Sequence, residues 1–318
     1  MKEKKCSFIL PTMNVEKYIG PLLENIFSQE YDGEIEVLIQ DSSNDGITPK
    51  IIKQFPVTYV WVEPDDYNYG KTRNEGASIT DGEFLVFLST DIEIIDNKWL
   101  AKLTGHFSDP AVAGVYGRQV PRKDCTPMEQ CFIRHTYPPD SATIAIENGK
   151  VTRRQTPVIF SNVNSAIRRS VWERIKIPEM LKGEEEEWAK RALIDGGKIV
   201  YDADAAVYHS HNYSLKRVFH DYFDTGVAYS VSKKNKIVEY PLRRFVAEGL
   251  IYITGEYKFM LTNGYTSWIP YAIIYDELKL LGMALGYKHR YIPLRVKRAL
   301  CRKKNHWDQY DDVIKEPL

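Results

Sequence analysis

The sequence has no excess of charge of either sign. Its 318 residues include 43 Lys and Arg against 43 Asp and Glu, so the formal net charge is zero. Such a balance creates no general attraction to nucleic acid, and we predict that the protein does not bind it. The apolar and charged fractions, 43% and 27%, are those of an ordinary globular protein. The length suits one large domain with an appendage.

Cysteine is scarce, and its four positions form no motif. Cys6, Cys125, Cys131 and Cys301 show no CxxC spacing. We therefore expect neither a disulfide framework nor a zinc site, and a reducing compartment.

Long apolar runs are also missing. The apolar run in the N-terminal "MKEKKCSFILP" is too short for a signal peptide. A membrane-spanning helix needs about 18 uninterrupted apolar residues. The best candidate, "WIPYAIIYDELKLLGMALG", is interrupted by Asp276, Glu277 and Lys279. These features predict a cytoplasmic protein without a spanning helix.

Two familiar phosphate-binding motifs are incomplete. Gly70-Lys71-Thr72 resembles the end of a P-loop, but Asp65 occupies the position where that motif needs its first glycine. No GxGxxG follows the first predicted strand, where Pro11 to Asn14 stand instead, and this disfavours a dinucleotide fold.

What is present is an alternation of strand and helix patterns. Strand-like runs precede helix-period runs several times, in the order 6–11, 14–29, 34–43, 47–55, 57–64, 70–80 and 84–88. Alternation of this kind predicts an α/β fold with a mostly parallel sheet. In such sheets ligands bind outside the carboxyl ends of the strands.

Each predicted strand ends in polar residues, which are at 12–14, 41–43, 63–66 and 89–91. Loops are polar in general, which explains any one of these ends, but four in succession favour a site. Asp91 follows the apolar run "FLVFL", where a lone carboxylate would be costly to desolvate. Mg²⁺ or Mn²⁺ bridging that carboxylate to a substrate diphosphate would remove the cost.

Five ordered segments carry a family resemblance: "SFILPTMNVEKYIGPLLENIFSQ", "EVLIQDSSNDGI", "YNYGKTRNEGA", "GEFLVFLSTDIEI" and "GEEEEWAKRALIDGGKIVYDADAAVYHSHNYS". Together they resemble the inverting family 2 glycosyltransferases, whose GT-A fold has a Rossmann-like, mostly parallel sheet flanked by helices. The resemblance covers residues 1–240 and leaves 241–318 as a helical extension. "DPAVAGVYGRQVPRKDCTPMEQ" and "VYHSHNYS" look most like bacterial rhamnosyltransferases that use dTDP-L-rhamnose.

The resemblance implies a donor-binding site along the strand ends. Asp41 matches the carboxylate that accepts the pyrimidine N3–H, which uracil and thymine share. Arg73 matches a positive residue near the diphosphate. Asp45 is either part of this site or a turn residue before Gly46, and Lys71 is either a diphosphate neighbour or a solvated helix residue. The complete implied donor set is Thr12, Asn14, Asp41, Ser43, Lys71, Arg73, Asn74 and Thr90.

The metal site implied by the resemblance departs from the family's pattern. Ser89 stands where the first carboxylate of an Asp-x-Asp motif is usual, so metal binding relies on Asp91. Glu93 is a weaker candidate. A histidine after a later strand completes such sites in family members, which points first to His209 and then to His211.

The acidic run Glu184 to Glu187 occupies the place of the family's catalytic base. An inverting transfer needs a base that deprotonates the acceptor hydroxyl. The resemblance assigns this role to Glu185, with Glu184 or Glu186 as alternatives. An acidic first turn that complements the helix dipole is the structural alternative.

Three residues are candidates for the acceptor site. Trp188 is either a wall under the acceptor sugar or a core residue, His211 is the second of the two histidines, and Asn164, like Asn162, is expected near the acceptor. The Pro-rich and charged stretch 118–144 is expected to be a loop that shapes this site.

The C-terminal part is basic and amphipathic. Between Gly286 and His306 there are eight Lys and Arg and no acidic residue. Such a segment predicts docking on an anionic membrane, where lipid-linked acceptors of this family reside. Packing on the catalytic domain or on a second subunit, giving a homo-oligomer, is the alternative.

Three functions are compatible with the sequence. The first is a metal-dependent transferase that moves L-rhamnose to a lipid-linked or growing cell-surface polysaccharide. The second is a UDP-sugar transferase of the same fold, since Asp41 cannot distinguish thymine from uracil. The third is a non-catalytic nucleotide-sugar-binding scaffold, suggested by Ser89 and by a glutamate in the place of the usual aspartate base.

Overall fold

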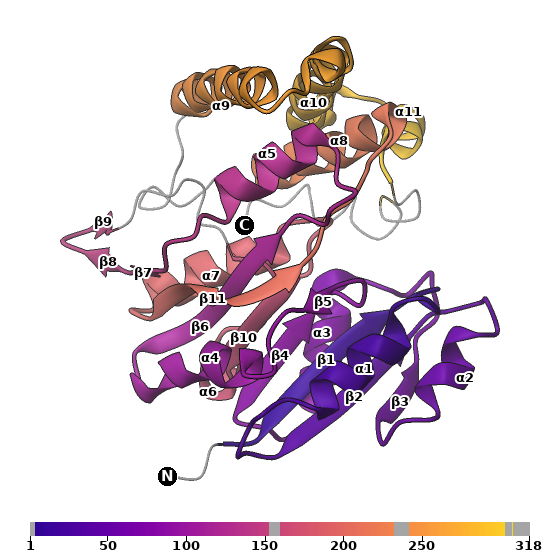
Figure 1. Cartoon of the computed structure of the whole chain (residues 1–318), viewed down its shortest axis with the longest axis vertical. Helices are drawn as coiled ribbons and strands as arrows, with labels where there is room; N and C mark the ends of the chain where they lie inside the picture. Colours follow the sequence, from indigo (N-terminus) through magenta and orange to yellow (C-terminus); the bar gives the residue numbers. More distant parts are fainter. Residues whose placement is uncertain (1–3, 153–159, 232–241, 303–306, 308–318) are drawn as a thin grey trace. The chain divides into compact units, whose positions relative to one another are not determined.

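The computed structural model describes residues 4–152, 160–231, 242–302 and 307 (Figure 1). The chain divides into two compact units. The first comprises Met1–Arg122, Arg134–Glu179 and Glu184–Ser210, and the second comprises Lys123–Ile133, Met180–Gly183 and His211–Leu318. The first unit is α/β and the second is helical.

The first unit is built on a nine-stranded mixed sheet, in which eight strands follow the order β3-β2-β1-β4-β10-β6-β11-β5 and β7 pairs with β11. The strands β3, β2, β1 and β4 run parallel, as the alternating pattern predicts, and β10 lies antiparallel between β4 and β6. The strands span Cys6–Thr12 (β1), Ile35–Asp41 (β2), Thr58–Trp61 (β3), Phe84–Leu88 (β4), Glu93–Ile94 (β5), Val112–Val120 (β6), Ala142–Ile144 (β7), Asn164–Arg168 (β10) and Lys198–Tyr208 (β11). A separate hairpin joins β8 (Ile146–Glu147) to β9 (Lys150–Val151).

Helices cover both faces of this sheet. Phe8 and Leu10 of β1 point into one core, which contains residues of α1 and α4, whereas Ile9 points to the opposite face and contacts Gly76 of α3. On that second face Gly114 of β6 meets Trp188 of α7. The helices span Ile19–Phe27 (α1), Thr48–Ile52 (α2), Tyr69–Ser78 (α3), Trp99–Gly105 (α4), His106–Ser108 (η1), Arg169–Arg174 (α6) and Glu184–Ile194 (α7).

β1 continues through Pro11, where the sequence predicted its end. Proline has no backbone N–H to donate to a neighbouring strand, so it is tolerated only where no strand pairs with that side of it. β4 pairs with β1 only as far as Ile9, whereas β2 pairs with it up to Thr12. The longer strand carries Thr12 to the carboxyl edge of the sheet beside Asp41.

The stretch 118–144, predicted as a loop, contains regular structure. It includes the end of β6, all of β7 and a ten-residue helix, α5 (Pro127–Thr136). α5 begins at a proline, which is favourable at the first position of a helix, and has Glu129 in its first turn and Arg134 in its last. The prediction of a loop was wrong because these start signals were read as irregular structure.

The second unit is a set of helices that includes α8 (Leu215–Val231), α9 (Leu242–Thr262), η2 (Thr266–Trp268), α10 (Ile269–Tyr287), η3 (His289–Tyr291) and α11 (Leu294–Leu300). Glycines allow α8 and α10 to pack closely. A Cβ at Gly226 of α8 would lie 2.3 Å from the carbonyl oxygen of Met283, and one at Gly286 of α10 would lie 2.0 Å from that of Phe223. Only glycine permits this approach of the two backbones.

The division into units differs from the expected boundary at 240/241, which itself lies outside the described residues. The last segment of the helical unit begins at His211 and includes α8, which packs against α10. No helix among the described residues is both long and apolar enough to cross a membrane. Residues 303–306 of the predicted basic segment lie outside the description.

Candidate functional site

The ends of β1 and β2 are joined by hydrogen bonds among two predicted donor-site residues and a neighbour. The backbone N–H of Asn14 donates to Ser43 Oγ at 2.7 Å, and Asn14 Oδ1 accepts from the backbone N–H of Asn44 at 3.0 Å. Asn14 has a φ of 51°, a left-handed conformation that asparagine tolerates. Thr12 donates to its own strand, at the carbonyl of Leu10. The parallel strands thus bring Thr12, Asn14 and Ser43 to one edge.

Asp41, predicted to accept a pyrimidine N–H, is fully buried at the end of β2. Its Oδ1 accepts from the backbone N–H of Ser43 at 3.0 Å, and its Oδ2 accepts from the hydroxyl of Tyr59 at 2.9 Å. Burial, together with this bond to a carboxylate, raises the pKa of Tyr59 to about 12. A carboxylate has about four lone-pair sites, so these two bonds leave acceptor capacity for one more donor.

Asp45 has the structural role that was one of its two alternatives. Its Oδ1 accepts from the backbone N–H groups of Ile47 and Thr48, each at 2.9 Å, and Thr48 Oγ1 donates to its Oδ2 at 2.5 Å. It therefore caps the start of α2, and Gly46 next to it has a φ of 67°.

The start of α3 is capped from within the chain. Asn68 Oδ1 accepts from the backbone N–H groups of Gly70 and Lys71, each at 3.0 Å. The Lys71 side chain is exposed, with its Nζ 3.9 Å from Glu75, as expected of a solvated helix residue.

The Asn74 side chain donates to the carbonyl of Ile177 and accepts from the backbone N–H of Ile177 and from the Trp172 indole. Asn74 thus anchors the segment after α6, a role the sequence did not indicate.

Arg73 and Glu184, predicted as separate donor and base residues, form a buried ion pair. Arg73 Nη1 donates to Glu184 Oε1 at 2.8 Å and to the carbonyl of Tyr69 at 3.2 Å. The guanidinium also lies 5.9 Å from the ring centre of Phe87 in β4. The pair joins α3 to the first residue of α7. The acidic first turn of α7 is therefore stabilised by Arg73 as well as by the helix dipole.

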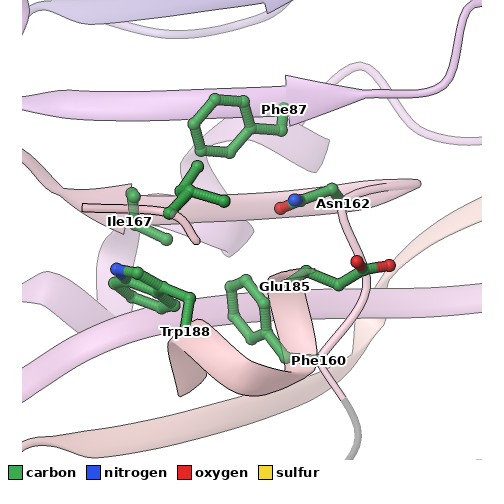
Figure 2. Close-up of a pocket in the computed structure, with 7 residues that line it drawn as sticks. Phe87, Phe160, Asn162, Ile167, Glu185 and Trp188 are labelled. Carbon is green, nitrogen blue, oxygen red and sulfur yellow. The ribbon is translucent and has the colours of Figure 1, made fainter. Parts of the chain in front are cut away.

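Glu185, the predicted base, is the next residue and lines a small hollow (Figure 2). Phe87, Phe160, Ile167, Ile177 and Trp188 supply apolar walls and Asn162 an amide. Figure 2 shows the Glu185 carboxylate pointing away from the rings of Phe160 and Trp188. Burial, and then the negative charge of Glu184, raise the pKa of Glu185 well above its usual value. A carboxylate of raised pKa is a stronger base than an ordinary one.

Asp91 is oriented by two neighbours just after β4. Ser89 Oγ donates to Asp91 Oδ1 at 2.6 Å, and the Arg122 guanidinium donates to the Asp91 carbonyl. Arg122 also donates to the carbonyl of Ser210 at 3.3 Å, which ties the residue after His209 to the Asp91 segment. Thr90 is buried between Ser89 and Asp91. The serine that replaces the first carboxylate of the motif therefore positions the second.

His209 faces Asp91, as the resemblance implied for a metal site. His209 Nε2 lies 3.6 Å from Asp91 Oδ1, and both residues belong to the first unit. Two ligands that each bind one Mg²⁺ at about 2.1 Å can be at most about 4.2 Å apart, so this separation fits a shared ion. His211, the second predicted histidine, follows two residues later in the chain and belongs to the second unit. An oxygen and imidazole donor set suits Mn²⁺ or Mg²⁺.

Glu93 is not part of this group. It is exposed, and it begins β5, where it pairs with Tyr208 of β11. Its carboxylate is not among the ligand atoms that group with those of Asp91 and His209.

Trp188 and Asn164, predicted to contact the acceptor, lie in the core instead. Trp188 is 1% exposed and its indole N–H donates to the carbonyl of Ile175 at 2.9 Å. Asn164 is fully buried; it accepts from the Trp99 indole and donates to the carbonyl of Ala205. Both side chains use their polar atoms to join elements of the fold. The core alternative for Trp188 fits this burial.

Sequence reasoning missed Gln119, Arg122 and Tyr59. Gln119 Oε1 lies 2.8 Å from His209 Nδ1, the Arg122 guanidinium donates to the Asp91 carbonyl, and the Tyr59 hydroxyl donates to Asp41. Each acts across a sheet or loop contact between segments far apart in the sequence. No local motif in the sequence marks these three positions.

Comparison with known proteins assigns the family. Residues 7–175, more than half of the chain, match the Glycosyl transferase family 2. The chain is 30% identical over 308 residues to the O-antigen chain rhamnosyltransferase RfbN of Salmonella typhimurium, covering 96% of each protein. It is also 30% identical over 305 residues to the O-antigen chain rhamnosyltransferase WbaN of Salmonella anatum, covering 95% of each.

Solved structures agree on the fold. The mannosyltransferase PcManGT of Pyrobaculum calidifontis, in complex with GDP-Man and Mn²⁺, superposes with a TM-score of 0.57 at 18% identity, covering 99% of this chain and 88% of that one. Residues 1–349 of Staphylococcus aureus TarS, in complex with UDP-GlcNAc, give a TM-score of 0.52 at 19% identity, covering 97% and 88%. The chain thus has a GT-A-like fold and is a glycosyltransferase of family 2.

Proposed function

We propose that the protein is a metal-dependent, inverting rhamnosyltransferase that uses dTDP-L-rhamnose to extend a cell-surface polysaccharide. The observation that carries this proposal is the 30% identity to two O-antigen chain rhamnosyltransferases over almost the whole of each chain. The grouping of Asp91 with His209, and of Arg73 with Glu184 and Glu185, supports a catalytic rather than a scaffold role.

In the proposed reaction an acceptor hydroxyl attacks the anomeric carbon of the donor sugar. The new glycosidic C–O bond forms as the bond from that carbon to the diphosphate oxygen breaks on the opposite face. The hydroxyl proton passes to the Glu185 carboxylate, and dTDP leaves with the bonding electron pair. Glu185 is preferred to Glu184 as the base, because Glu184 Oε1 is already bonded to Arg73.

The donor would lie along the carboxyl ends of β1, β2 and β4. Asp41 would accept the thymine N3–H with its remaining acceptor capacity, and Asn14 and Ser43 would border the ribose. Asp91 and His209 would hold Mg²⁺ or Mn²⁺ near the diphosphate. A divalent ion there supplies positive charge that offsets the charge growing on the leaving group.

Calorimetric titration with dTDP and with UDP, each with and without Mn²⁺, tests the donor. We expect dTDP to bind more tightly than UDP, and its affinity to fall without metal and in Asp91→Ala. Transfer of radiolabelled rhamnose from dTDP-L-rhamnose to a lipid-linked saccharide would then complete the test. A preference for UDP would replace the first proposal with the UDP-sugar transferase, and binding of neither nucleotide would contradict both.

We further propose that the acceptor is lipid-linked and that the helical unit docks on an anionic membrane. The apolar α10 face supports this; it consists of four half-exposed side chains, Ile273, Ile274, Leu280 and Leu281. The opposite side of the same helix buries Asp276 and Lys279, which pair at 3.2 Å. A helix that buries charges and exposes aliphatic side chains fits an apolar environment on its outer face.

Charge and aromatic residues at the ends of α10 favour a lipid surface over a second copy of the chain. Trp268 precedes the helix, and Tyr291, which is 89% exposed, follows it. Lys288 and Arg290 are exposed at the same end as Tyr291. Aromatic residues and Lys or Arg that flank an apolar face are typical of helices that lie in a membrane interface. Exposed Glu277 on the apolar α10 face fits a helix at headgroup depth.

Cosedimentation with vesicles tests this docking. We expect binding to vesicles that contain anionic phosphatidylglycerol and little binding to neutral phosphatidylcholine, with loss of binding in the double variant Leu280→Ser/Leu281→Ser. Ile79→Ser is the matched control, because Ile79 is an equally exposed aliphatic residue of the first unit. Undiminished vesicle binding by the double variant would contradict the proposal. It would also be contradicted if the wild type formed a concentration-dependent dimer and the double variant were a monomer.

A further inference from the structure

We propose that Gln119 is a positioning residue for the metal site: its side-chain amide fixes the His209 imidazole in the tautomer whose Nε2 can bind a divalent ion. This inference rests on the proposed function only in taking Asp91 and His209 as metal ligands. It concerns a side chain that does not itself touch the ion.

Strand pairing brings the two side chains together. β6 and β11 run parallel with Gln119 opposite Val207, and the backbone N–H of His209 donates to the carbonyl of Val120 at 3.0 Å. Side chains two residues apart on a strand point to the same face, so His209 projects on the face of Val207 and Gln119. The resulting distance from Gln119 Oε1 to His209 Nδ1 is 2.8 Å, and both residues are at least nine-tenths buried.

The far side of the amide is anchored by Ser161. Gln119 Nε2 lies 3.2 Å from Ser161 Oγ, and that oxygen also accepts from the backbone N–H of Val163 at 3.4 Å. Ser161 itself is held by its carbonyl, which accepts from the backbone N–H of Asn164. In this arrangement the amide nitrogen of Gln119 faces Ser161 and the amide oxygen faces His209.

An amide oxygen can only accept, so the proton of the neutral imidazole must be on Nδ1. The lone pair is then on Nε2, the atom that lies 3.6 Å from Asp91 Oδ1. Metal-binding histidines are commonly oriented by an acceptor on the other ring nitrogen. Gln119 provides this acceptor without adding a charge beside the ion.

Two measurements test the inference, both without donor or acceptor. The first is nitrogen NMR of the metal-free protein labelled with ¹⁵N-histidine, with His209→Ala to assign the signals of His209. We expect Nδ1 to be protonated in the wild type and the proton to move toward Nε2 in Gln119→Met, which has nearly the same volume but no acceptor oxygen.

The second measurement is Mn²⁺ binding followed by electron paramagnetic resonance. We expect Gln119→Met to bind Mn²⁺ about tenfold more weakly. Gln119→Glu keeps the acceptor oxygen, so we expect it to bind Mn²⁺ within a few-fold of the wild type. If Gln119→Met does not fold, Gln119→Asn, whose shorter side chain cannot reach Nδ1, is measured with the same expectation.

The outcomes separate this inference from the proposed function. A wild-type His209 protonated on Nε2 would overturn it, and so would wild-type Mn²⁺ affinity in Gln119→Met when His209→Ala binds weakly. If Asp91→Ala and His209→Ala both bind Mn²⁺ as well as the wild type, the metal site itself is wrong and the role of Gln119 falls with it.

Discussion

Arg73 Nη1 donates a hydrogen bond to Glu184 Oε1 at 2.8 Å across 111 positions of sequence, and both side chains are buried. A buried charge that loses its partner is strongly destabilising, typically by about 3–5 kcal/mol. We therefore expect Arg73→Met and Glu184→Leu each to lower the free energy of unfolding by about 3 kcal/mol. Chemical denaturation of the two variants measures this.

The double variant Arg73→Met/Glu184→Leu provides the control. Replacing both charges by apolar side chains leaves no unpaired charge, so we expect it to be more stable than the sum of the two single changes implies. Additive losses would mean that the two charges do not interact in solution.

The pH dependence of activity reports on Glu185. Burial and the charge of Glu184 raise the pKa of Glu185, so an active base that must be deprotonated gains activity only as the pH rises through that raised pKa. In Glu184→Gln one negative neighbour is gone and the positive charge of Arg73 is no longer offset. Both changes lower the pKa of Glu185, and the acidic limb of kcat/KM should move to lower pH.

Glu187→Gln is the matched control for this profile. Glu187 is in the same helical turn but pairs with Arg191 at 3.1 Å. We expect its acidic limb to coincide with that of the wild type. An acidic limb that stays in place in Glu184→Gln would remove Glu185 from the role of base.

The stability of the helical unit should fall as the pH rises, because of Glu256. This side chain is fully buried, and its Oε1 accepts from the Tyr252 hydroxyl at 3.0 Å. Burial raises the pKa of Glu256 from its ordinary value of 4.5 to about 8. The folded state therefore holds this proton between pH 4.5 and about 8 while the unfolded chain has released it.

The resulting stabilisation is full below pH 4.5 and is lost as the pH rises through about 8. The slope from this one group is at most about 1.4 kcal/mol per pH unit. Glu256→Gln cannot ionise, so denaturation curves between pH 5 and 8 should show a flatter dependence than the wild type. Glu277→Gln, an exposed change on α10, should leave the wild-type slope, and an unchanged slope in Glu256→Gln would refute the assignment.

The sequence predicted features that depend on residues near one another in the chain better than it predicted contacts between distant segments. The parallel strands follow from the alternation of short runs, and the resemblance of a few short motifs pointed to Asp91 and to His209 and His211. The pairing of Arg73 with Glu184, the support of His209 by Gln119 and the burial of Asn164 depend on which strand neighbours which. The antiparallel insertion of β10 between β4 and β6 sets those neighbours, and no short pattern reveals it. For the same reason the sequence did not indicate the packing of α8 against α10, which begins more than 50 residues later.

Ser89 gives the last prediction, because its Oγ donates to Asp91 Oδ1 at 2.6 Å where the family's motif usually has a carboxylate. Ser89→Asp places two carboxylates side by side, and like charges in contact repel unless a cation lies between them. We expect Ser89→Asp to have a lower Tm than the wild type in EDTA, and a larger rise in Tm on addition of Mn²⁺. Ser89→Ala, which loses the hydrogen bond but adds no charge, is the control and should bind Mn²⁺ several-fold more weakly than the wild type. If Mn²⁺ raises the Tm of Ser89→Asp no more than that of the wild type, a carboxylate at position 89 does not reach the ion, and Ser89 does not occupy a ligand position.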